Sequence, residues 1–183
     1  MQFDEVILKR QTIRSYTKKE ISIDELDKIV EAGRLAPSAK NRQPWRFYYL
    51  NDEQKNYIVN KMYEWEKNNR NEKTSVKGSA DQMKEANKVI MIYYPLYKCK
   101  WKNIYYKKVD YLSLGAAIEN MSLKCTEMGL GSCWCADTLY IDKEIDEYLG
   151  IHGYEQISAL MIGYPKKVLP KRKKKTVQEL KMN

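Results

Sequence analysis

The chain has 183 residues, which suits one domain and allows a substantial hydrophobic core. Hydrophobic residues make up 43% and charged residues 31%, the balance of a globular rather than a disordered protein. No apolar run approaches the roughly 18–20 residues of a membrane span, and the start MQFDEVILKR lacks a signal-peptide core. We therefore expect a soluble, cytoplasmic protein.

The formal net charge is +9, which favours anionic partners ranging from a phosphate group to nucleic acid. Part of this charge is local, because five consecutive cations occupy positions 171–175 and Lys166 and Lys167 lie just before them. Taken alone, this run is typical of a solvated, flexible tail.

The first part of the chain predicts helices around one buried strand. Phe3, Val6 and Ile7 recur at helical spacing, which predicts a short first helix. Ser22 can cap a second helix, with Glu25 placed for a capping box. We expect that helix to end near Gly33 and Pro37, a buried strand over 45–50, and a third helix over 52–69.

The second part alternates helices and strands. The longest helix, over 109–128, is apolar on several sides, which is typical of a central helix. The alternation predicts a mixed α/β or α+β sheet packed by helices. The other expected elements are a loop over 68–79, a helix over 81–85, a strand over 88–94 stopped by Pro95, a strand over 131–137, a helix over 141–149 and a strand over 157–162.

The cysteines do not form a metal-binding pattern. Cys99, Cys125, Cys133 and Cys135 lack a C-x-x-C pair, and His152 is the only histidine. This is a poor ligand set for zinc, so we expect no metal and interpret the cysteines as ordinary buried thiols.

Four segments combine residues that can bind a cofactor. If 10–14 is extended, Arg10, Thr12 and Arg14 point to one side and form a site for a phosphate or another anion. The loop over 36–45 carries side-chain amides that can bind the edge of a heterocycle. The other two segments are the turn GLGSCW at 129–134 and GYP at 163–165, which precedes the basic run.

Each segment also has an ordinary structural interpretation when it is taken alone. The charged segment can be plain surface, the amides can cap local backbone, and the two glycines can form a tight turn instead of admitting a flat ligand. The glycine turn is not G-x-G-x-x-G, and the chain has neither a P-loop nor a G-x-S-x-G elbow. Because the chain has a single histidine, a histidine-based catalytic triad is not favoured.

In this order, however, the segments resemble the nitroreductase family. Its pattern is R-x-S/T-x-R, A-P-S-x-x-N-x-Q-P-W, G-A-A-x-E-N-M, G-L-G-S-C-W and a G-Y-P turn followed by a basic segment. The corresponding segments here are 10–14, 36–45, 115–121, 129–134 and 163–174, and they cover nearly the whole chain. The resemblance implies one α+β domain over 1–183, with a central, mostly antiparallel sheet flanked by helices, in an intertwined homodimer.

The resemblance also implies FMN at the dimer interface and ping-pong chemistry. NAD(P)H would reduce the flavin and leave before a nitroaromatic or quinone-like acceptor takes the electrons. No side chain would act as a catalytic acid or base, because the flavin carries the chemistry.

The residues implied in cofactor binding lie in four groups. Arg10 and Thr12 would face the phosphate and Arg14 the flavin N1/O2 end, while Gln11 stands where a basic or small residue is common. Arg172 and Lys174 would close on the phosphate. The partner chain would supply Pro37, Ser38, Ala39, Asn41 and Gln43, and the isoalloxazine would lie near Cys135, Ala136 and Asp137.

Two features depart from the pattern. The stretch after Trp134 lacks a glycine that often donates to the flavin, and 64–82 matches no family motif, so we expect it on the substrate side. Other flavin chemistry remains an alternative, namely a flavin reductase, a dehalogenase or a flavin-consuming enzyme. A flavin-binding protein without turnover and a basic nucleic-acid-binding module are the further alternatives.

Overall fold

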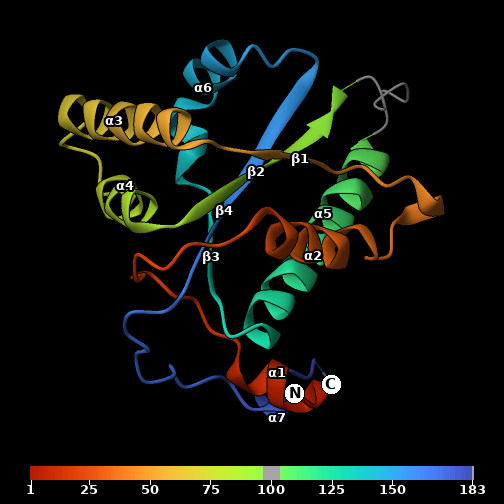
Figure 1. Cartoon of the computed structure of the whole chain (residues 1–183). Coiled ribbons are helices and arrows are strands. Elements are labelled where there is room, and N and C mark those ends of the chain that lie inside the picture. The colour runs from red at the N-terminus through yellow and green to blue at the C-terminus, as the bar shows by residue number, and fades with distance from the viewer. Residues whose placement is uncertain (97–103, 183) are drawn as a thin grey trace.

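The computed structural model describes residues 1–96 and 104–182, so Cys99 lies outside the described residues. Four strands form one antiparallel sheet in the order β1-β2-β4-β3 (Figure 1). Their bounds are Arg46–Tyr49 for β1, Lys88–Pro95 for β2, Gly131–Cys135 for β3 and Tyr154–Gly163 for β4. The expected α+β fold with an antiparallel sheet is confirmed. β4 begins three residues before the expected 157, and β3 ends two residues before the expected 137.

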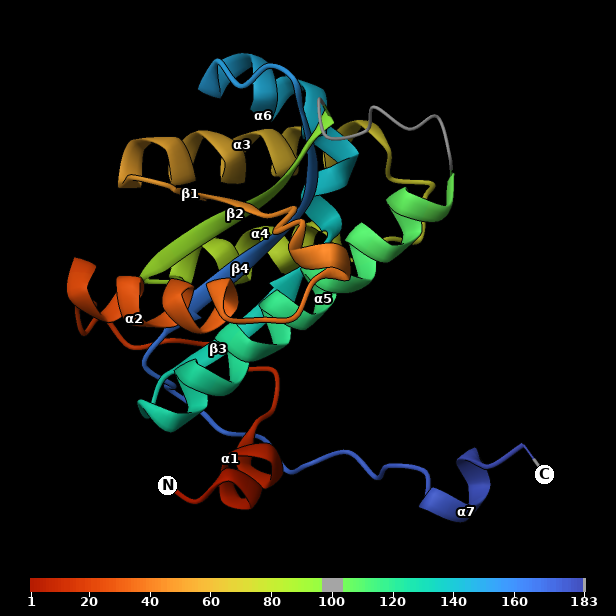
Figure 2. The same cartoon turned by 90° about the vertical axis from the view of Figure 1, so that its right-hand side faces the viewer.

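Helices cover both faces of the sheet (Figure 2). One face packs against α2 (Ile23–Arg34) and α5 (Ile104–Glu127). The other face packs against α3 (Asp52–Asn68), α4 (Val76–Glu85) and α6 (Asp142–Leu149). Ser22 and Glu25 form the expected capping box at the start of α2.

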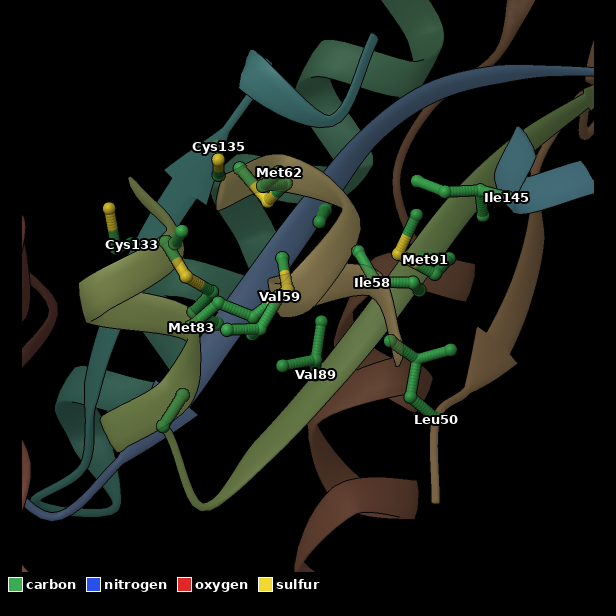
Figure 3. Packing of buried hydrophobic residues seen from close by; sticks show 14 of the residues in the cluster. Leu50, Ile58, Val59, Met62, Met83, Val89, Met91, Cys133, Cys135 and Ile145 are labelled. Carbon is green, nitrogen blue, oxygen red and sulfur yellow. The ribbon is translucent and has the colours of Figure 1, made fainter. Parts of the chain in front are cut away.

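Strand β2 shows why the sheet carries two cores. Successive side chains of a strand point to opposite faces, and those of β2 are apolar on both. Val89, Met91 and Tyr93 join the α3/α4 core, part of which is drawn in Figure 3. Ile90, Ile92 and Tyr94 join the α2/α5 core. An unbroken apolar run therefore encodes a central strand rather than an edge strand.

Helix α4 corrects the expected loop over 68–79 and the short helix over 81–85. It begins at Val76, because Val76, Ala80 and Met83 recur at helical spacing and are all fully buried. Polar neighbours and Gly78 mask this stripe in the sequence, since they occupy the outer face of the same helix.

Helix α5 begins at Ile104, five residues before the expected start. Its inner stripe, Leu114, Ala117, Ile118 and Met121, is fully buried. Leu112 lies outside that stripe and is 74% exposed. The helix therefore packs in the core along one side, while part of its other side is exposed in the single chain.

Both termini extend from the body of the molecule. Helix α1 (Phe3–Lys9) lies below the sheet, and the C-terminal segment runs past it to α7 (Val177–Leu180) (Figures 1 and 2). Residues 166–182 are exposed, as expected, but α7 with its Thr176 capping box was not predicted. None of the described helices combines the length and apolarity needed to cross a bilayer.

Candidate functional site

The 10–14 segment is extended and lies along the start of β3. Thr12 forms a parallel bridge with Ser132, and the Ile13 amide donates to the Ser132 carbonyl at 2.9 Å. Ile13 is buried, whereas Thr12 and Arg14 are exposed. The alternation expected from the sequence is therefore present, with the apolar residue inward and its polar neighbours outward.

Gly131 permits this close approach. A Cβ at Gly131 would lie 2.6 Å from the Cβ of Ile13, which is shorter than any ordinary contact. The preceding Gly129 has φ +75°, the left-handed conformation that commonly ends a helix. The space left by the missing Gly131 side chain is thus occupied by Ile13, so the close approach at this glycine is that of the 10–14 segment.

Two cationic segments meet at the end of α1. Arg10 Nε lies 3.1 Å from Glu119 Oε1 on α5, and the Arg10 side chain is 28% exposed. Lys171 in the C-terminal segment donates from Nζ to the Leu8 carbonyl, two residues before Arg10. This contact places Lys171, the first residue of the basic run, beside the end of α1, which leads into the 10–14 segment.

The loop after α2 has an unusual backbone. Lys40, Asn41 and Gln43 have φ of 52°, 51° and 46°, in the left-handed region that side chains other than glycine rarely adopt. Lys40 and Asn41 belong to the short helix η1 (Ala39–Asn41). The backbone N–H of Gln43 donates to Ser38 Oγ at 3.0 Å. Strain of this kind persists where the surroundings enforce it, commonly at functional sites.

A buried ion pair enforces this conformation. Arg42 donates from Nε and Nη2 to the Asp110 carboxylate at 2.9 and 2.8 Å, and Tyr94 donates its hydroxyl to Asp110 at 3.1 Å. Asp110 is fully buried on α5. No motif in the sequence indicates this anchor, although Asp110 lies four residues before Leu114, at the head of the inner apolar stripe of α5.

Two of the four groups of predicted cofactor residues, the 10–14 segment and the 37–43 loop, attach to opposite faces of α5. Arg10 pairs with Glu119 and Arg42 with Asp110, and nine residues separate these two carboxylates. At 100° and 1.5 Å per residue, nine residues turn the helix by about 180° and advance it by about 13 Å. One chain therefore presents the 10–14 segment and the 37–43 loop on different sides of the same helix.

The last residue of β3 and the two residues after it lie mostly within the fold. Cys135 is 5% exposed and packs in the α3/α4 core. Asp137 accepts hydrogen bonds from the hydroxyls of Ser75 and Ser79, both at 2.6 Å, so its carboxylate attaches η3 (Asp137–Ile141) to α4. Ala136 alone among the three is exposed. A ligand at this position would meet backbone rather than the Cys135 or Asp137 side chain.

The described cysteines are buried thiols. Burial raises the pKa of Cys133 to about 11 and that of Cys125 to about 12. Burial likewise raises the pKa of Cys135. Across residues 1–96 and 104–182, no group of three or more His, Cys, Asp or Glu side chains is placed to hold a metal ion.

A surface cavity of about 830 Å³ lies beside the chain that follows the 10–14 segment. It contains none of the predicted cofactor residues, and its mixed charges give it no evident ligand. Its lining consists of Tyr16, Thr17, Lys18, Tyr63, Asp81, Lys84, Glu85 and Lys166.

Comparison with known proteins agrees with this arrangement. Residues 7–164 match the model of the Nitroreductase family. The chain is 24% identical over 176 residues to YfhC of Bacillus subtilis, a candidate NAD(P)H nitroreductase, covering 94% of this chain and 88% of YfhC. It is also 24% identical over 178 residues to an iodotyrosine deiodinase of Thermotoga neapolitana, covering 89% and 88% of the two chains.

A similar solved structure is that of a candidate nitroreductase of Desulfovibrio desulfuricans in complex with FMN. It superposes with a TM-score of 0.82 at 21% identity, covering 100% of this chain and 96% of that one. The family match spans the extended 10–14 segment, the anchored loop and the whole sheet. The chain therefore belongs to the Nitroreductase family.

Proposed function

We propose that this protein is a homodimeric FMN enzyme that moves electrons from NAD(P)H to nitroaromatic or quinone-like acceptors in two half-reactions. Family membership supports the general chemistry of an NAD(P)H-dependent flavin oxidoreductase. Bound FMN would accept a hydride from NAD(P)H and return two electrons to the acceptor. For a nitro group, two electrons and two protons yield a nitroso group and water, with one proton supplied by solvent.

The observation that carries the proposal is the meeting of two cationic segments at the end of α1. The 10–14 segment offers two guanidinium groups and a hydroxyl, and Lys171 holds the basic run beside it. A dianionic phosphate ester needs such a donor set. Arg10, Thr12, Arg14, Arg172 and Lys174 would hold the phosphate end, and the phosphate would replace Glu119 as the partner of Arg10.

Dimerisation would bring in the second group of residues. The 37–43 loop and the 10–14 segment lie on different sides of α5 in one chain, so the loop of a two-fold-related partner would supply the missing residues. We propose that Pro37, Ser38, Ala39, Asn41 and Gln43 complete the partner's site. The amides of Asn41 and Gln43 offer both donors and acceptors to the edge of the flavin ring.

Exposed apolar side chains support a dimer. An apolar groove of about 400 Å³ lies between α1, α2 and α5. Large apolar residues are exposed around it and along the C-terminal segment, which marks an interaction surface. They include Phe3, Leu8, Leu35, Leu112, Val168, Leu169, Val177 and Leu180.

Anaerobic stopped flow tests the proposal. The purified protein should be yellow, NADH or NADPH should bleach the flavin, and a nitroaromatic or quinone should restore its absorbance. Arg10→Ala should weaken FMN binding more than Lys18→Ala, because Lys18 lies outside the cationic cluster. A protein that takes up no FMN, or whose flavin neither nicotinamide bleaches within minutes, contradicts the proposal.

Reductive dehalogenation is the second candidate, and the match to the deiodinase along 89% of the chain favours it. The two reactions differ only in the acceptor, so the same reduced enzyme separates them. Release of iodide from an iodophenol, with no reduction of nitroaromatics or quinones, would favour the dehalogenase.

Nucleic-acid binding is not part of the proposed function. The basic run is short and lies beside the predicted phosphate site, whereas nonspecific nucleic-acid binding needs an extended cationic track. Sub-micromolar RNA or DNA binding at about 0.15 M salt that competes with FMN would overturn this assignment.

A further inference from the structure

We infer that Lys40 and Tyr106 select planar aromatic anions as electron acceptors. The inference rests on the proposed function, because it assigns a substrate class to the same site. Lys40 lies between Ala39 and Asn41 of the strained loop, and Tyr106 lies in the first turn of α5. Neither residue belongs to the predicted cofactor-binding set.

The geometry of this cluster combines cations with aromatic faces. Lys40 Nζ lies 3.3 Å from the Tyr106 hydroxyl oxygen and 5.4 Å from the centroid of its ring. Arg42 Cζ lies 5.3 Å from the same centroid. The Tyr105 ring, whose residue is 60% exposed, meets the Tyr106 ring edge-on at 5.4 Å and 78°. Flat rings and cations thus share one surface.

The charge of the cluster comes from Lys40. Arg42 is neutralised by Asp110, and nearby Lys107 pairs with Glu155 at 2.9 Å. Among the described residues, no carboxylate oxygen lies within 4 Å of the Lys40 ammonium nitrogen. An incoming carboxylate or sulfonate can therefore pair with Lys40 without displacing an internal acid, while its ring packs on the tyrosines.

The backbone holds Lys40 at this place. Its φ is 52°, its ammonium group contacts Tyr106 on α5, and the buried Arg42–Asp110 pair two residues later keeps the loop attached to that helix. Because Ala39 and Asn41 are predicted to touch the flavin of the partner, Lys40 would lie beside that flavin, where the acceptor enters. An anionic acceptor would be drawn to this entrance, whereas a neutral analogue of the same shape would gain nothing from the charge.

The experiment compares two acceptors that differ in charge and little in shape, 4-nitrobenzoate and 4-nitrobenzamide. In the FMN-loaded wild type, kcat/KM should be higher for the anion. Lys40→Gln should lower the ratio of the two kcat/KM values about two- to fivefold, the effect of one exposed charge pair. The change should appear in KM for the anion, and Lys40→Arg should retain the preference. Raising the salt concentration should shrink the wild-type ratio.

Lys28→Gln is the matched control. Lys28 is an exposed lysine on α2, outside both the predicted cofactor residues and the 64–82 segment, and its variant should leave the ratio unchanged. A second measurement needs no turnover: benzoate should perturb the flavin spectrum at lower concentration than benzamide, and Lys40→Gln should remove the difference. Equal ratios in wild type and Lys40→Gln, or equal binding of the two ligands, overturn the inference. Failure to reduce either acceptor, with selective benzoate binding retained, instead contradicts the proposed function alone.

Discussion

At the scale of single residues, Asp110 controls the conformation of the strained loop. Its carboxylate is fully buried and accepts from both Arg42 and Tyr94, so three distant parts of the chain meet at one charge. A buried ion pair contributes less to net stability than its distances suggest, because both charges lose water. Removing one partner is nevertheless costly, since the other charge remains desolvated.

Asp110→Asn should therefore lower the free energy of unfolding by about 2–4 kcal/mol and weaken FMN binding. Urea denaturation at fixed protein concentration and fluorescence titration with FMN measure the two effects. Glu31→Gln is the control, because it breaks the equally short but exposed Arg34–Glu31 pair, and it should change neither quantity. Equal effects of the two substitutions would contradict the structural role of Asp110.

The buried thiols give a second prediction at this scale. Because burial raises the pKa of Cys133 to about 11, less than about 1% of this thiol is ionised at pH 8, and the more buried Cys125 is ionised still less. Iodoacetamide at pH 8 should leave both cysteines unmodified in the native protein and modify both in guanidinium chloride. Peptide mass mapping measures the alkylation of Cys133 and Cys125 and distinguishes it from alkylation of Cys99. Rapid native modification of Cys133 would place it on an accessible surface.

At the scale of elements, the approach of the 10–14 segment to β3 depends on Gly131. Gly131→Ala should push Ile13 outward, lower the free energy of unfolding by about 1–3 kcal/mol and weaken FMN binding. Gly78→Ala is the matched control. Gly78 is an exposed helical residue with space for a Cβ, so this change should stabilise the protein by about 0.5–1 kcal/mol. Denaturant titration compares the two variants, and a stabilising Gly131→Ala would show that the segment packs elsewhere.

Most elements could be predicted from local pattern, and the failures have physical causes. The capping box of Ser22 and Glu25 and the buried strand over 88–94 could both be predicted. Each depends on residues that are close together in the sequence. The start of α4 could not be predicted, because Gly78 and polar residues separate its buried apolar residues in the sequence and obscure their helical spacing. The loop at 38–43 was recognised by motif, but its left-handed backbone depends on Asp110, which lies far along the chain.

At the scale of the whole molecule, the single chain leaves many apolar groups exposed. Leu112 on α5 and Phe3 on α1 are 74% and 69% exposed, although their positions in the sequence suggest burial. The sequence of one chain cannot distinguish burial within a fold from burial against a partner, because both require the same apolar side chains. A homodimer would account for these surfaces and for the placement of cofactor residues on opposite faces of α5.

Mixing two defective variants tests whether the site is shared between chains. Arg10→Ala/Arg14→Ala disables the cationic segment, and Asn41→Ala/Gln43→Ala disables the loop, so either homodimer should bind FMN poorly. In a heterodimer, one site would combine both defects, but the other would combine the intact segment of one chain with the intact loop of its partner.

Random pairing makes half of the dimers heterodimers, so co-expression should restore about a quarter of the wild-type FMN sites. Affinity purification through two different tags should raise this to about half. If the site lies within one chain, the heterodimer carries a defect in both sites and mixing restores none of the flavin binding, which light scattering and flavin absorbance would establish on the same sample.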